Sequence, residues 1–211
     1  MTYNNRDYLL SSDNQDITLW ESFRNGDREA FALLFRRHYE ALFRYGSKFT
    51  VATPVLEDTI QELFMELWQA KSRTPVLSVR AYLLKALKYK LLKKYTQMLN
   101  TLPLREEEGG FEWSHETSLI ARQDSVEKEK IVVEALNRLS NRQKEIIYLK
   151  YYQNLSYEEV SEIMNINYQA ARNLLYQAIK SLKGWLPGSL EIFLLIFASC
   201  QHYNFHGFGT I

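Results

Sequence analysis

The sequence predicts an all-α protein made of two small helical domains that a flexible acidic linker joins. Hydrophobic residues make up 46% of the 211 residues, which is enough to form cores and too much for an intrinsically disordered chain. The chain has only 8 glycines and 4 prolines. Its apolar residues recur at three- and four-residue steps, and no convincing run shows the alternation of a strand. Helices packed on helices are therefore the expected architecture.

The first helical block is expected between about residues 16 and 95. Its first part carries an apolar stripe that follows Asp27, a suitable N-cap. The stripe includes His38, which we interpret as a packed or boundary histidine. A second helix is predicted to begin near Pro54, because proline suits the first turn of a helix. A loop around Pro75 then separates it from a third helix, VRAYLLKALKYKLLKKY, at residues 79–95.

This third helix is strongly basic. Residues 67–105 contain nine lysines and arginines and no acidic residue, although the formal net charge of the whole chain is only +1. A basic amphipathic helix can lie on a membrane, bind a partner or contact nucleic acid. On a helical wheel its leucines fall together and its bases ring the later turns, whereas a membrane-surface helix would segregate its bases on one polar face. The pattern therefore disfavours a membrane surface and leaves a protein partner or nucleic acid as interpretations.

The second helical block, residues 126–186, contains two helices joined by the short turn NIN. Ser156 and Glu159 form a capping-box pattern that predicts the start of the first of these helices. The second is expected to carry five polar or aromatic residues off its apolar face: Tyr168, Gln169, Arg172, Asn173 and Tyr176. This arrangement is typical of a helix-turn-helix, whose second helix enters the major groove of DNA. An ordinary helical hairpin has the same pattern, and the pattern alone does not decide between them.

Two longer motifs carry a resemblance to a known family. The segment LEDTIQELFMELWQAKSRTPVLSVRAYLLKAL resembles region 2 of the extracytoplasmic-function (group IV) sigma factors of the sigma-70 family. The segment ALNRLSNRQKEIIYLKYYQNLSYEEVSEIMNINYQAARNLLYQAIKSL resembles their region 4. Within the family, the chain is most similar to the iron-citrate-type branch of Bacteroidetes. The resemblance implies region 2 at 1–97, a linker with an acidic run at 98–125, region 4 at 126–186, and an unmatched apolar tail at 187–211.

The resemblance implies a subunit that binds core RNA polymerase and directs transcription initiation at specific promoters. Region 2 would bind the β′ clamp helices of polymerase through Asp58, Gln61, Glu62, Phe64, Leu67 and Trp68. It would bind the −10 promoter element through Arg73, Arg80, Lys85, Lys88, Tyr89 and Lys90. Region 4 would bind the β flap and, through the five residues named above, the −35 element.

Two features of the basic helix depart from the family pattern. Lys88 and Tyr89 stand where Arg-Asn is usual, and Lys93 stands where an aspartate is usual. These departures leave the −10 preference, and any specific role of Tyr89, open. The resemblance further implies an anti-sigma factor as a partner, of a kind that is usually membrane-anchored.

The sequence predicts no enzyme, cofactor, metal site or membrane insertion. No Ser-His-Asp set or phosphate-binding loop is present, and Cys200, His202 and His206 are interpreted as a chance grouping, because zinc sites need more well-spaced ligands. The N-terminus has no signal-peptide pattern, and the longest apolar run, residues 190–199, is too short to span a bilayer. A cytoplasmic location is expected. A stand-alone helix-turn-helix regulator and a membrane-surface or scaffold protein remain as alternatives.

Overall fold

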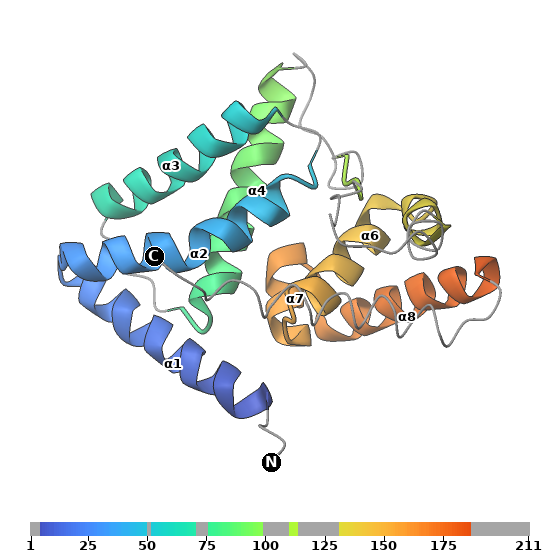
Figure 1. Ribbon diagram of the computed structural model, residues 1–211, viewed down its shortest axis with the longest axis horizontal. Helices are drawn as coiled ribbons and strands as arrows, with labels where there is room; N and C mark the ends of the chain where they lie inside the picture. Colours follow the sequence, from blue (N-terminus) through green and yellow to red (C-terminus); the bar gives the residue numbers. More distant parts are fainter. Residues whose placement is uncertain (1–4, 50–51, 71–75, 99–109, 114–130, 187–211) are drawn as a thin grey trace, which may run out of the picture. The chain divides into compact units, whose positions relative to one another are not determined.

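The computed structural model describes residues 5–49, 52–70, 76–98, 110–113 and 131–186, and it contains helices and no strand within these ranges (Figure 1). The all-α prediction is confirmed. The chain divides into two compact units, of which the first is formed mainly by Met1–Leu104 and the second mainly by Arg105–Ser161 and Asn165–Ile211. The division between Leu104 and Arg105 falls inside the predicted linker. The apolar tail, 187–211, lies outside the described residues.

The first unit is a bundle of four helices. They are α1 (Asn5–Arg24), α2 (Arg28–Gly46), α3 (Thr53–Ala70) and α4 (Val79–Met98). Helix α2 packs against each of the other three, and α4 also contacts α1 and α3 (Figure 1). The largest fully buried side chains of this unit are Trp20, Leu34, Leu42, Tyr45, Leu56, Ile60, Leu83, Leu84, Leu87 and Leu91. The core therefore contains the apolar stripes of α2, α3 and α4.

Local signals in the sequence place the ends of these helices. The Asp27 carboxylate accepts hydrogen bonds from the backbone N–H groups of Glu29 at 2.8 Å and Ala30 at 3.2 Å, which confirms the predicted N-cap of α2. Pro54 lies in the first turn of α3. His38 is buried, and its Nε2 atom lies 3.1 Å from Oδ2 of the buried Asp16. This agrees with its interpretation as a packed histidine.

Helices α2 and α3 approach each other closely at Gly46, the last residue of α2. Gly46 is buried, and a Cβ atom added to it would overlap the side chain of Leu56 on α3. Leu56 is itself only 1% exposed, so it has little room to move aside. Glycine at this position is therefore required by packing between helices and not by an unusual backbone angle.

The second unit contains the predicted helix-turn-helix. Residues 131–137 are helical, and the later elements are α6 (Asn141–Ile147), the π-helix η1 (Tyr148–Tyr152), α7 (Tyr157–Met164) and α8 (Tyr168–Trp185). The sequence predicts one helix over residues 141–152, and the structure divides that stretch into α6 and η1. In η1 the N–H of Gln153 donates to the carbonyl of Tyr148 at 3.0 Å, a step of five residues.

Part of the predicted flexible linker is packed onto the second unit. Phe111 and Trp113 are 1% and 6% exposed, and the Trp113 ring lies edge-on to the stacked rings of Tyr148 and Tyr152, at centroid distances of 5.6 and 4.7 Å. The Asn137 amide forms two 3.1 Å hydrogen bonds with the backbone of Trp113, accepting from its N–H and donating to its carbonyl. The prediction of a flexible linker is therefore corrected at residues 111–113. Its other parts, 99–109 and 114–125, lie outside the described residues.

We expect Gly46→Ala to destabilise the protein by about 1–3 kcal/mol, because the added methyl group overpacks the contact between α2 and Leu56. Urea unfolding followed by circular dichroism would measure the loss. Gly184→Ala is the matched control, since Gly184 lies in α8 with nothing within 4 Å of an added Cβ. The free energy of unfolding of that variant should increase by up to about 1 kcal/mol, because alanine has a higher helix propensity than glycine. Equal effects at the two glycines would contradict the packing argument.

Candidate nucleic-acid and protein interfaces

The turn before α8 fixes the direction in which that helix starts. Ser156 and Glu159 form the predicted capping box at α7, with hydrogen bonds of 2.8 and 3.2 Å between each side chain and the other residue's N–H. Asn165 adopts a left-handed backbone conformation with φ of 50°, which asparagine tolerates better than most residues. The Asn167 side chain then accepts a 2.7 Å hydrogen bond from the Ala170 N–H and caps α8. The structure confirms the predicted pair of helices with a tight turn.

All five residues predicted to contact the −35 element lie on the exposed face of α8. Tyr168 and Tyr176 are 44% and 67% exposed, and Gln169, Arg172 and Asn173 are also exposed. The opposite face is buried through Ala171, Leu175, Ala178 and Leu182. The helix carries three basic residues and no acid, a balance that favours approach to phosphates.

Two contacts among these side chains orient four of the five. The side-chain amide of Gln169 donates a 3.0 Å hydrogen bond to the side-chain oxygen Oδ1 of Asn173, one turn later. The Arg172 guanidinium lies 5.9 Å from the centre of the Tyr168 ring, within the range of a cation–π contact. The side chains are thus partly ordered before any ligand arrives, which reduces the entropy lost on binding.

Lys150 joins the π-helix to the start of α7. Its ammonium donates a 2.6 Å hydrogen bond to the Leu155 carbonyl and lies 4.6 Å from the centre of the Tyr157 ring. Burial lowers the pKa of Lys150, and the nearby Glu159 and Glu158 partly offset that effect. We assign this lysine a structural role in positioning the helix-turn-helix. No pattern in the sequence indicates this role, because the contact depends on the π-helical turn.

The six residues predicted to bind polymerase divide into two groups on α3. Asp58, Gln61 and Glu62 are exposed, whereas Phe64 and Leu67 are only 4% and 6% exposed. Trp68 is half-buried, and its ring packs 5.1 Å from that of Phe31. The prediction that Phe64 and Leu67 belong to a contact surface is corrected, because both side chains are buried in the core of the first unit.

The residues predicted to bind the −10 element also divide. Lys85 and Tyr89 are exposed, Tyr89 by 73%, and together with the exposed Lys93 they form a stripe at four-residue steps along α4. Lys88 is only 4% exposed and is corrected to a buried residue, since it shares a stripe with the fully buried Leu84 and Leu91. Arg80 and Lys90 are half-buried, and Arg73 lies outside the described residues.

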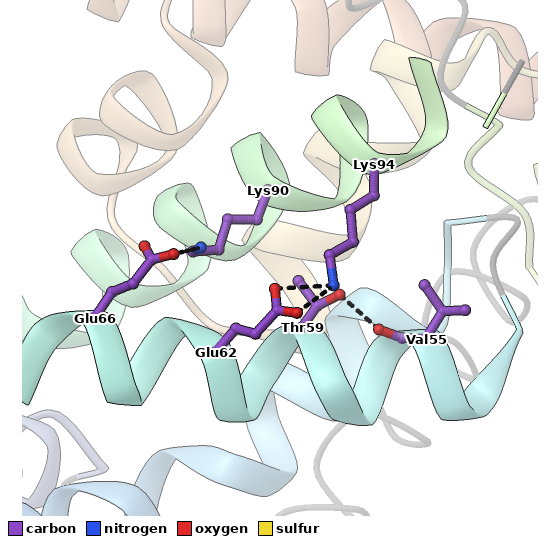
Figure 2. Close-up of polar contacts among 6 residues, drawn as sticks. All are labelled: Val55, Thr59, Glu62, Glu66, Lys90 and Lys94. Atoms are coloured by element: carbon purple, nitrogen blue, oxygen red, sulfur yellow. Dashed lines mark hydrogen bonds and ion pairs between the residues drawn. The ribbon is translucent and has the colours of Figure 1, made fainter. Parts of the chain in front are cut away.

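Two ion pairs join the helices that carry the two predicted surfaces, and each pair includes one residue from the predicted sets, Lys90 in one and Glu62 in the other. The Lys90 ammonium lies 2.6 Å from Oε1 of Glu66, and the Lys94 ammonium lies 2.9 Å from both carboxylate oxygens of Glu62. Figure 2 shows both contacts. These pairs join α4 to α3 along the same side of the bundle. The sequence missed them, because an ion pair between separate helices depends on how those helices are packed.

Neither a metal site nor a membrane span is found in the part of the chain that the structure describes. No group of three or more His, Cys, Asp or Glu side chains is positioned there to hold a metal ion. None of the helices in these residues is long and apolar enough to cross a membrane. The grouping of Cys200, His202 and His206 lies outside the described residues.

Comparison with known proteins places the second unit in a recognised class. Residues 129–182 match the family described as sigma-70, region 4. Most of the chain is similar to the ECF RNA polymerase sigma factor SigK of Mycobacterium ulcerans (strain Agy99), with 23% identity over 175 residues that cover 81% of this chain and 93% of that protein. Residues 129–182 thus match sigma-70 region 4, and most of the chain is similar to an ECF sigma factor.

Two solved structures share the fold. The first is CnrH in complex with the cytosolic domain of CnrY, with a TM-score of 0.55 and 20% identity over 80% of this chain and 95% of that chain. The second is the sigma factor RpoE in complex with the anti-sigma factor NepR from Bartonella quintana, with a TM-score of 0.54 and 19% identity over 75% and 97% of the two chains. These structural matches cover 80% and 75% of the chain, and so include residues outside the 129–182 stretch that matches the family.

Proposed function

We propose that this chain is an extracytoplasmic-function sigma factor that binds core RNA polymerase and directs transcription from promoters with specific −35 and −10 elements. The observation that carries the proposal is the exposed polar face of α8, which lies within the stretch that matches sigma-70 region 4. We further propose the iron-citrate-type branch and a cytoplasmic location. Residues 1–97, 98–125 and 126–186 act as region 2, linker and region 4.

Helix α8 is proposed to read the −35 element in the major groove. Gln169 and Asn173 carry amides that can pair with adenine, and Arg172 carries a guanidinium that can pair with guanine or bind a phosphate. Tyr168 and Tyr176 are exposed at the same end of the helix and can contact the backbone or a thymine methyl group. The order imposed by the Gln169–Asn173 hydrogen bond supports this assignment.

The exposed stripe of α4 is proposed to hold the melted −10 strand. Tyr89 offers a ring on which an unpaired base can stack, while Lys85 and Lys93, one turn to either side, lie where they can follow the phosphates. Melting requires no chemical catalyst, because an equilibrium shifts when the open strand is bound better than the duplex. The protein therefore needs no catalytic residue or cofactor, and polymerase performs the chemistry.

The proposed partners are core polymerase, promoter DNA and an anti-sigma factor. Asp58, Gln61 and Glu62 present an acidic and polar surface on α3 that can pair with basic residues of a polymerase helix, and region 4 is proposed to contact the β flap. An anti-sigma partner is supported by the solved relative in complex with the anti-sigma factor NepR. We propose that such a partner of this chain is membrane-anchored.

Run-off transcription with core polymerase on genomic promoter fragments tests the proposal. We expect the full-length protein to bind core polymerase and to start transcripts at discrete sites, whose upstream sequences define the two elements. A stand-alone helix-turn-helix regulator would instead bind duplex DNA tightly without polymerase. Failure to bind core polymerase or to start transcripts would reject the sigma-factor assignment.

We expect Arg172→Ala to reduce run-off transcription about tenfold to 100-fold on a promoter with its native −35 element, because one good base contact contributes about 1–3 kcal/mol. The base preference at the contacted position should also relax. Lys180→Ala is the control, since Lys180 is an exposed base in the later half of the same helix. It should have a smaller effect with no change in base preference. Equal losses and unchanged preference in both variants would contradict the assignment.

Tyr89→Ala should reduce the fraction of open complex about fivefold or more, because stacking of a base on an aromatic ring contributes about 1–3 kcal/mol. Tyr89→Phe keeps the ring and should stay near the wild-type level. Permanganate reactivity of −10 thymines measures strand opening, and a premelted promoter should restore activity to the alanine variant. Equal defects in the alanine and phenylalanine variants would remove stacking as the role of Tyr89.

A further inference from the structure

The basic residues of α4 are presented in different ways. Lys85 and Lys93 are exposed beside Tyr89. Lys90 and Lys94 are less exposed and turn toward α3, where they form ion pairs with Glu66 and Glu62 (Figure 2). The two lysines are four residues apart, and so are the two glutamates. Each set therefore lies on one side of its own helix, and the two pairs form consecutive contacts along the line where α3 and α4 pack.

The two partners in each ion pair differ in exposure. The side chains of Lys90 and Lys94 are 19% and 28% exposed, whereas those of Glu66 and Glu62 are 64% and 48% exposed. Most of each lysine side chain is thus covered, and its charge is paired with a carboxylate. The carboxylates remain open to an approaching cation, since a carboxylate can accept hydrogen bonds on both of its oxygens.

We propose that these two ion pairs form an electrostatic latch that couples the binding of a basic protein surface at α3 to the binding of nucleic acid at α4. In the latched state Lys90 and Lys94 are withheld from phosphates. A partner that brings its own cations to Glu62 and Glu66 competes with the lysines and releases them toward DNA. The inference rests on the proposed function for the identity of the two ligands, polymerase and promoter DNA.

The small net free energy of ion pairs that are partly open to water is compatible with a latch that opens. Such pairs contribute little net stability in water, so exchange of one cation for another on a carboxylate meets only a small cost. Because coupling between two ligands is reciprocal, phosphates that bind Lys90 and Lys94 also make the glutamates more available to the protein partner. The free protein would then bind DNA weakly and non-specifically, and the complex would bind it better.

The latch is tested with the full-length protein in the absence of polymerase. The probe is a fluorescently labelled single-stranded oligonucleotide of 20 mixed nucleotides, and the affinity is measured by anisotropy at low salt. Glu62→Gln with Glu66→Gln should bind the probe about threefold to tenfold more tightly than the wild type, because each released pair is worth at most a few-fold. The salt dependence should also steepen by up to about 1.4 in log–log slope, as two lysines reach phosphates.

The matched control is Glu57→Gln with Asp58→Asn. It removes the same number of negative charges from the same helix, at residues outside the two ion pairs shown in Figure 2. An equal gain in the two double variants would overturn the latch and leave only a general effect of charge. A gain specific to Glu62 and Glu66 that disappears when Lys90→Gln and Lys94→Gln are added would support it.

These outcomes are distinct from failure of the proposed function. If the wild-type protein neither binds core polymerase nor starts transcripts, the sigma-factor assignment fails, and the oligonucleotide comparison still decides whether the ion pairs withhold the lysines. If the wild type starts transcripts but Glu62→Gln with Glu66→Gln gains no more affinity than the control, the latch is wrong and the function stands. Circular dichroism of each variant confirms that the helices are intact, so that affinities are compared between folded proteins.

Discussion

Burial of the leucine face of α4 determines what the first unit can present to a ligand. Leu83, Leu84 and Leu87 are at most 1% exposed, as is Leu91 one turn further on. Because each helical residue advances by about 100°, these positions fix the rotation of α4 about its axis. The exposed stripe through Tyr89, the buried Lys88 and the lysines paired with α3 all follow from that rotation. A net count of basic residues could not have separated these three environments.

In the second unit, buried alanines separate the buried and exposed sides of α8, as the leucines do on α4. Ala171 and Ala178 are fully buried, which places the apolar side of α8 against its neighbours and leaves Gln169, Arg172 and Asn173 facing outward. Two asparagines set the geometry of the turn between α7 and α8. Asn165 adopts the left-handed backbone conformation, and Asn167 caps α8. The orientation of Gln169, Arg172 and Asn173 thus depends on packing and capping by other residues of the second unit.

The sequence predicted most of what depends on local signals. The N-cap at Asp27, the capping box at Ser156 and the outward face of α8 follow from spacing and residue type, and the structure agrees with each. Features that depend on tertiary packing were not predicted. The family pattern assigns Lys88 to the −10 surface, whereas its side chain is buried in the structure. The family pattern also assigns Phe64 and Leu67 to a partner surface, although their spacing fits a core as well. The ion pairs of Glu62 and Glu66 depend on how α3 packs against α4. The π-helix η1 has no simple signature in spacing.

The docking of Phe111 and Trp113 changes the length of the tether available to the protein. Phe111 is an anchor on the second unit, so only the residues from Met98 to Phe111 connect the end of α4 to it. That stretch can extend over at most roughly 45 Å, whereas the full stretch 98–125 could extend over roughly twice that distance. A shorter tether raises the effective concentration at which the second of two linked units meets its site once the first is bound. Under the proposed function, in which both units bind promoter DNA, the aromatic anchor makes promoter engagement more nearly a single event than two independent ones.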